Sequence, residues 1–351
     1  MGCKWCALRY RQNPLKKTLK SAWPYLRVVL SVLLLWLAVR NIDFKALKES
    51  DISIQPAWLL LAIAIMILGN LMATLRWGWL MRSVGLYRTG FEYVTLYFTG
   101  GLINQGLPST IGGDSYRAIE GSRIDSKSKE HLPSISEELH QKVDLNKAPP
   151  RLRLSFVATG LDRGLGLFGN NILGAIGLIL GGAMIAPWGQ DAGWLALIGM
   201  LSIIVIAYLT LRIARTRKLV QAVFNKLGMP GGVAALDHAF GWPDVIPQTI
   251  NSTLIHFLTT IAFWCCLRAY GVSAPMDALM VGLPALGLLT MLPISISGWG
   301  LREATLSAAL ALWGVDPSVC VMASVSFGLI TVIVYLPSAI ALLKRRKKSA
   351  H

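Results

Sequence analysis

Charged residues are scarce in this chain. Only 15% of its 351 residues are Asp, Glu, Lys or Arg, whereas 54% are hydrophobic, and the mean hydropathy is +0.54. A soluble domain carries about a quarter charged residues. The scarcity therefore excludes a soluble enzyme fold, a disordered chain and a secreted disulfide scaffold. It predicts instead an all-α polytopic membrane protein.

Cysteine is also infrequent, with five residues in the whole chain. Cys3 and Cys6 form one C-x-x-C pair, but no second pair follows to complete a zinc site. Cys265, Cys266 and Cys320 fall in apolar runs, where a thiol acts as a small hydrophobic group. We therefore expect neither a bound metal nor a cofactor.

Two common enzyme motifs are missing. The sequence contains no G-x-x-x-x-G-K-[ST] motif, so ATP-driven export is unsupported. No serine stands in a G-x-S-x-G context. We expect that this protein is not an enzyme. Any driving force would come from a gradient, the membrane potential or product removal.

Acidic residues are outnumbered 18 to 34 by Lys and Arg, which gives a net charge of +16. The basic residues gather before Ser21, from Arg117 to Arg153, from Arg212 to Lys226, and in the tail from Lys344. Clusters in alternate loops follow the positive-inside rule and do not indicate a nucleic-acid partner. The predicted organisation is a basic arm (1–21), a transmembrane domain (22–343) and a basic tail (344–351). Both termini are expected to be cytoplasmic, in the inner (cytoplasmic) membrane.

Hydrophobic runs predict eight membrane elements. A helix needs about 20 apolar residues to cross the bilayer. Two stretches, Glu92–Ile111 and Ala278–Leu312, are apolar but broken by Pro and Gly, so each predicts a re-entrant hairpin or a pair of short helices. Six runs are long enough to be full spans: Ala22–Val39, Ala57–Leu80, Ser155–Ala186, Trp194–Leu211, Val245–Leu267 and Val319–Leu343.

Two polar segments are candidates for surface helices. Part of the cytoplasmic loop Gly121–Pro150, from Ser134 to Val143, combines a capping box with an apolar repeat every four residues. The segment Thr216–Leu227 has apolar residues on one side and bases around them, as in a helix that lies on the membrane surface. The alternative is that both are ordinary cytoplasmic loops.

The two broken stretches share the pattern L-P-x-x-x-x-G-x-x-x-R. One copy runs from Leu107 to Arg117 and the other from Leu292 to Arg302, with the prolines 185 residues apart. With six spans and cytoplasmic termini, the two stretches enter the membrane from opposite sides. Such a recurrence predicts an inverted repeat with a substrate site at the repeat interface.

The chemistry of the breaks favours an anion. Pro and Gly unwind the helix, and freed polar groups must then face protein or a watery cavity. A helix that restarts after Gly113 or Gly298 would point its positive N-terminus at that cavity, where Arg117 and Arg302 could grip a phosphate. The alternative is that Asp114–Arg117 and Arg302–Glu303 are structural charge pairs.

These motifs resemble a known family, the lysylphosphatidylglycerol synthase transmembrane-region family of flippase-like membrane proteins. The resemblance covers about Ala22 to Leu343. It implies a protein that moves a lipid between leaflets. The residues that carry it are Arg76, Trp77, Leu107, Pro108, Gly112, Gly113, Asp114, Arg117, Asp162, Arg163, Pro293, Gly298, Arg302 and Glu303. The candidate substrate-binding residues are Arg76, Asn104, Gly112, Gly113, Asp114, Arg117, Asp162, Arg163, Gly298, Arg302 and Glu303.

Several of these residues have a second interpretation. Arg76 could be an interfacial anchor, and Asp162 and Arg163 could neutralise each other. Asn104 could be a helix stop or part of a cavity wall. His256, in an apolar span, is interpreted as a packed residue because no second His or Cys stands at ligand spacing.

The expected function is transport of an anionic phospholipid or a polyprenyl-phosphate-linked lipid. Only three residues follow Lys348, so we expect no soluble aminoacyl-transferase domain. One alternative is an accessory subunit that presents lipid to a separate transferase. Another is an integral-membrane lipid-modifying or glycosyl-transferring enzyme, for which Asp114 or Glu303 would be the catalytic acid.

Overall fold

The computed structural model describes residues 33, 36, 54–106, 111–123, 148–227, 229, 232–241, 243–291, 295 and 297–349. All regular elements within these ranges are helices. The predicted span Ala22–Val39 lies outside the described residues except for Leu33 and Trp36, and so does the helix expected around Ser134. The prolines of the two repeated motifs also lie outside them.

Four helices are long and apolar enough to cross a membrane. They are α3 (Pro56–Ser83), α7 (Ala148–Gly181, extended by the 3-10 turn η2, Gly182–Met184), α11 (Val245–Ala269) and α14 (Pro317–Tyr335). Each corresponds to one of the predicted spans. The protein is therefore a multi-pass α-helical membrane protein.

One other predicted span is present as a helix: the run Trp194–Leu211 lies within α8 (Gly189–Arg212), a helix of 24 residues that follows η2. The predicted span Val319–Leu343, which contains α14, is not one helix: α14 ends at Tyr335 and α15 (Ser338–Ser349) follows. Pro337 stands at the junction, where its ring and missing N–H oppose a continuous helix.

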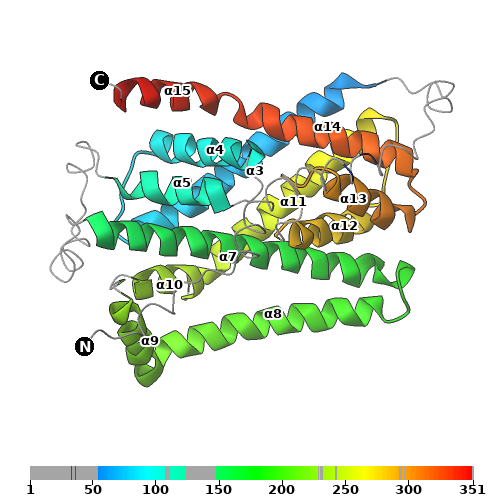
Figure 1. Ribbon diagram of the computed structural model, residues 1–351. Coiled ribbons are helices and arrows are strands. Elements are labelled where there is room, and N and C mark those ends of the chain that lie inside the picture. The colour runs from blue at the N-terminus through cyan, green and yellow to red at the C-terminus, as the bar shows by residue number, and fades with distance from the viewer. Residues whose placement is uncertain are drawn as a thin grey trace, which may run out of the picture.

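A pair of helices lies at each broken stretch, although the first pair extends beyond the predicted Glu92–Ile111 to Ser122. The first pair is α4 (Gly90–Gly106) and α5 (Ile111–Ser122), and the second is α12 (Met276–Leu289) and α13 (Leu301–Ala311). The two helices of each pair pack against each other. Figure 1 shows the α4–α5 pair near one end of α7 and the α12–α13 pair near the other.

The helix contacts repeat between the two halves. At the centre α3 packs along α11. In the first half α5 packs on α7, and in the second half α13 packs on α14. Each hairpin also crosses to the other half, because α12 packs on α7 and α4 packs on α14. The helix contacts of the two halves are therefore reciprocal within the described residues, and the inverted repeat remains a prediction from the two motifs.

One apolar core lies behind each hairpin. The first cluster centres on Trp77 of α3, and the second on Phe263 of α11, both fully buried. Large apolar side chains on the outer faces are exposed, including Leu60 of α3 and Leu195 of α8. In water such a surface would be unfavourable, whereas hydrocarbon chains match it.

Two short helices lie at one end of the molecule beside α8. They are α9 (Ala214–Lys226) and α10 (Gly232–Phe240), and α9 crosses the end of α8 (Figure 1). No residue of α9 is buried, and its apolar Leu219 and Val223 are exposed. The predicted helix at Thr216–Leu227 is therefore present, with the amphipathic character of a helix at a membrane interface.

This arrangement predicts that the two ends of α8 lie on opposite sides of the membrane. Its length is about 36 Å at 1.5 Å per residue, against a hydrocarbon core of about 30 Å. In a variant lacking Cys3 and Cys6, a cysteine at the exposed Gln190 should react with an impermeant maleimide added outside intact cells. A cysteine at Lys218 should react only after the membrane is opened. Labelling of both from one side would contradict a spanning α8.

Candidate functional site

A buried carboxylate joins three helices. Asp162 of α7 accepts a hydrogen bond from Nε of Arg76 on α3 at 2.9 Å and one from Nη1 of Arg117 on α5 at 3.3 Å. All three side chains are at most 5% exposed. A charge buried in this way needs a partner, because desolvation costs several kcal/mol per ion. The three residues therefore hold α3, α5 and α7 in register.

A second carboxylate extends this network to the surface. Asp114 of α5 accepts from Arg117 Nη2 at 2.6 Å and from Arg163 Nε and Nη2 at 2.5 and 2.9 Å. The Arg163 side chain is 45% exposed and Asp114 is 18% exposed. The network of three arginines and two aspartates carries one net positive charge. Its accessible edge is thus a place that attracts anions.

Aromatic rings cover the buried end of Arg117. Its guanidinium carbon lies 4.4 Å from the ring centre of Tyr97 and 5.2 Å from that of Trp77. The Trp77 indole N–H donates to Thr159 Oγ1 at 3.1 Å. A desolvated cation over an aromatic face gains about 2 kcal/mol, which supplements the two carboxylates.

The first hairpin closes at two glycines. Gly113 N donates to the side-chain oxygen of Asn104 at 2.7 Å, and a Cβ on Gly113 would lie only 2.0 Å from the carbonyl oxygen of Gly100. The expectation of unwound backbone at Gly113 is wrong, because α5 already begins at Ile111 and Gly113 lies in its first turn. Glycine is required there for close approach of α4. Its neighbour Gly112 is half-buried in the same turn.

The second hairpin does unwind where the sequence predicts it. Gly298 and Gly300 have φ of +80° and +79°, and Ser297 has φ of +51°, which is unusual for a residue with a side chain. Helix α13 then starts at Leu301. The Glu303 carboxylate caps it by accepting from Gly300 N at 2.6 Å.

Arg302 and Glu303 form a buried ion pair next to this turn. Arg302 Nε and Nη2 donate to Glu303 Oε1 at 3.0 and 2.7 Å, and Nε also lies 3.1 Å from Ser324 Oγ on α14. The guanidinium stacks on Trp299 at 4.7 Å. Its Nη1 makes no hydrogen bond to any described residue. Because Trp299 and Gly328 lie against the guanidinium, the Nη1 edge is the part of Arg302 that could bind an anion.

Arg302 lines a cavity of about 300 Å³ between the hairpins. Ser297 Oγ donates to Gln105 Oε1 at 2.8 Å across the cavity edge, and this bond links the second hairpin to the first. The wall mixes polar and apolar groups from six helices. The residues that line it are Gln105, Asn170, Leu173, His256, Thr259, Thr260, Leu283, Pro284, Leu286, Gly287, Thr290, Ser297, Gly298, Arg302, Phe327 and Thr331.

Of the candidate substrate-binding residues, only Gly298 and Arg302 line this cavity. Glu303 lies behind Arg302 as its counter-ion and helix cap. Arg76, Arg117, Asp114, Asp162 and Arg163 are brought together in the network near the other hairpin, and Asn104, Gly112 and Gly113 lie beside it. The structure thus separates the candidates into two polar groups.

The network and the cavity are connected along two helices. Arg76 Nη1 donates to Ser252 Oγ of α11 at 2.9 Å, and His256, one turn later, lines the cavity. The Arg76 guanidinium also rests against Gly166 of α7, and Asn170, one turn further, lines the cavity. Asp162 and Asn170 are eight residues apart, about 12 Å along the helix. Polar groups therefore follow one another between the two hairpins.

The family of this chain is shown by comparison with known proteins. Residues 25–339 match the family described as the lysylphosphatidylglycerol synthase TM region. The chain belongs to this family. No curated protein and no solved structure matches it. Membership supports a lipid-related function in the membrane, in agreement with the resemblance found in the motifs.

In this member of the lysylphosphatidylglycerol synthase TM-region family, fourteen of the sixteen residues that line the cavity were not among the sequence candidates. Two of them, Gln105 and Asn170, carry an amide within apolar helices, where a polar side chain is a candidate for a functional position. Asn170 donates to the carbonyl oxygen of Pro284 in α12 at 3.0 Å, next to the helix break that proline causes. His256 was interpreted as packed, but it lines the cavity.

Replacement of Asp162 tests the buried network. In Asp162→Asn the side chain keeps its size, but Arg76 and Arg117 lose a buried counter-charge, which costs about 3–5 kcal/mol. The thermal unfolding temperature of the purified protein should fall clearly. The matched control is Asp237→Asn, which breaks the Asp237–Arg217 pair at 2.7 Å in a more exposed place and should cost at most about 1 kcal/mol. Equal effects would contradict the structural role of Asp162.

Replacement of Gly113 tests the close approach of α4 and α5. Alanine normally favours a helix over glycine by about 1 kcal/mol. In Gly113→Ala the new Cβ would instead strike Gly100, so the variant should be destabilised by about 1–3 kcal/mol. Gly160→Ala, where nothing lies within 4 Å of the added Cβ, is the control and should be neutral or stabilising. Thermal unfolding of both variants compares them directly.

Proposed function

We propose that this protein translocates an anionic lipid between the leaflets of the cytoplasmic membrane, with both termini in the cytoplasm. The lipid is a phospholipid or a polyprenyl-phosphate-linked lipid. The observation that carries the proposal is the cavity between the hairpins, which Arg302 lines and where its Nη1 has no hydrogen-bond partner among the described residues. Arginine binds phosphate with a planar, bidentate geometry that suits this position.

The size of the cavity fits a head group and not a whole lipid. Ligand pockets that enclose drug-sized molecules measure about 300–1,000 Å³. At about 300 Å³ the cavity would hold a phosphate with a small polar substituent. The acyl or prenyl chains would remain in the bilayer. This division matches the requirement of translocation, because only the polar head group meets a barrier in the hydrocarbon core.

The polar groups between the hairpins would form the route of the head group. From Arg302 the phosphate would pass Asn170 and His256 towards the Asp114–Arg163 edge of the network. The Ser297–Gln105 hydrogen bond would have to open for this passage, and it would act as a gate between the hairpins. The two repeated motifs would then serve as the entry and exit sites of one path.

The geometry favours transport over catalysis. A catalytic acid would have to face the substrate, but the Glu303 carboxylate is fully buried and is occupied by Arg302, Ser324 and Gly300 N. Asp114 is held by Arg117 and Arg163. Both carboxylates therefore act as counter-ions to guanidinium groups.

Reconstitution tests this proposal. Purified protein is reconstituted into liposomes that contain fluorescent phosphatidylglycerol, and dithionite is added outside. Lipid that moves from the inner to the outer leaflet should be quenched without any added protein or nucleotide. Arg302→Ala should lower the affinity for the lipid tenfold to a hundredfold, about 1.5–3 kcal/mol for a lost charged hydrogen bond. Arg302→Lys should recover only part of it because an ammonium lacks the planar fork.

The control is Arg82→Ala, which removes an exposed arginine at the end of α3 that stacks on Tyr93. This variant should transport as the wild type does. Wild-type transport by Arg302→Ala would overturn the assignment of the cavity. Transport that appears only when a lipid transferase is added would favour the accessory-subunit alternative.

A further inference from the structure

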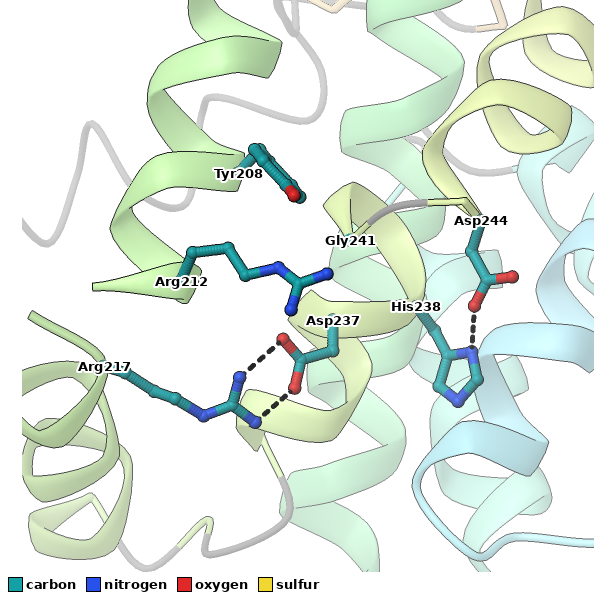
Figure 2. Close-up of a pocket in the computed structure, with 7 residues that line it drawn as sticks. All are labelled: Tyr208, Arg212, Arg217, Asp237, His238, Gly241 and Asp244. Atoms are coloured by element: carbon teal, nitrogen blue, oxygen red, sulfur yellow. Dashed lines mark hydrogen bonds and ion pairs between the residues drawn. The ribbon is translucent and has the colours of Figure 1, made fainter. Parts of the chain in front are cut away.

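A second pocket lies far from the hairpin cavity, where α8 ends and α11 begins. It measures about 260 Å³ and is enclosed by α8, α9, α10 and the start of α11 (Figure 2). No residue of the transport path lines it. Its residues are Tyr208, Arg212, Arg217, Asp237, His238, Gly241 and Asp244.

The acidic residues of this pocket are already paired. Arg217 donates to both Asp237 oxygens at 3.2 and 2.7 Å, and His238 Nδ1 lies 2.8 Å from Asp244 Oδ2. Figure 2 shows both pairs, with the Arg212 guanidinium directed into the space between Tyr208 and Asp237. Arg212 stacks on Tyr208 at 5.4 Å and has no carboxylate partner among the described residues. The pocket therefore offers one cation to an anionic ligand.

An apolar groove continues from this pocket. It measures about 450 Å³ and runs between α8 and the first turns of α11. Tyr208 lines both spaces, so they lie next to each other on α8. The residues that line the groove are Leu201, Val205, Tyr208, Val245, Ile246, Thr249 and Ile250.

The two walls of the groove belong to helices that do not pack closely on each other. Within the described residues, α7 and α10 each pack on both α8 and α11, whereas α8 and α11 are not themselves a closely packed pair. Along α8 the groove runs from Leu201 to Tyr208, seven residues or about 10 Å, and the pocket continues from there to Arg212. Groove and pocket together extend about 16 Å, about half of a 30 Å hydrocarbon core.

We propose that this pocket and groove bind one membrane phospholipid. The phosphate diester sits on Arg212, the glycerol lies at Tyr208, and one acyl chain occupies the groove. A cation one turn beyond the end of an apolar groove complements a phospholipid at both ends. The bound lipid fills the seam between α8 and α11, and it is separate from the lipid that the hairpin cavity transports.

Native mass spectrometry tests the proposal in an Arg302→Ala background, where binding to the hairpin cavity is weakened. Protein washed in detergent is titrated with three probes: phosphatidylglycerol, dioleoylglycerol and inorganic phosphate. Phosphatidylglycerol should bind at one molecule per chain. Dioleoylglycerol, which lacks the phosphate, and inorganic phosphate, which lacks the chains, should each bind at least tenfold more weakly.

Two variants on this background define the site. Arg212→Ala should weaken phosphatidylglycerol binding at least tenfold. Val205→Trp, at an exposed position of the groove wall, should also weaken it because the indole occupies the chain's place. The control is Arg215→Ala, an exposed arginine of α9 that does not line the pocket, and it should bind as the parent does.

Three results would overturn the proposal. If Arg212→Ala and Arg215→Ala bind phosphatidylglycerol equally, the lipid belongs to the annular lipids around the protein and is not bound at this site. Phosphate that binds as tightly as phosphatidylglycerol would indicate a free-anion site, and dioleoylglycerol that does so would indicate an apolar groove alone. None of these results depends on transport, because dithionite quenching in liposomes measures that activity separately.

Discussion

A charge buried inside a membrane protein must be matched by an opposite charge, and the arrangement of α3, α5 and α7 depends on this constraint. Asp162 lies 86 residues from Arg76 and 45 from Arg117 in the chain, yet it binds both. If either helix shifted by one turn, a guanidinium would be buried alone. The desolvation cost of such an error is several kcal/mol, comparable to the whole stability of many domains. The network thus fixes the place of the first hairpin.

The sequence predicts those parts of the fold that depend on local pattern. Long apolar runs identify α3, α7, α11 and α14, because a helix is the only open-chain element that satisfies its own backbone in lipid. Pro and Gly predict both hairpins, because they interrupt the helix that an apolar run would otherwise form. The sequence does not show which charges pair, because partners such as Asp162 and Arg76 lie far apart along the chain. Both residues belong to the motifs that carry the family resemblance. Their alternative interpretations, Arg76 as an interfacial anchor and Asp162 as neutralised by Arg163, do not describe the contacts that the structure shows.

The errors in the site also have physical causes. Gly113 and Gly298 occupy the same place in the repeated motif, and the sequence assigns both to unwound backbone. Only Gly298 has positive φ, whereas Gly113 is helical and allows Gly100 to approach. Glycine serves both purposes, so its presence does not distinguish them. Gln105, Asn170 and His256 are polar residues in otherwise apolar helices, and only the packing of α4, α7 and α11 places them around one cavity.

The same motif therefore has two environments in one molecule. Arg117 is enclosed by Asp162, Asp114, Tyr97 and Trp77, whereas Arg302 has one carboxylate and an open face towards the cavity. In transporters built as inverted repeats, the two halves can exchange conformations, and the exchange converts a cavity at one side into a cavity at the other. Under the transport function proposed here, the enclosed environment of Arg117 and the cavity-lining environment of Arg302 would be the two forms of one element. Exchange between them would carry the head-group site from one hairpin to the other.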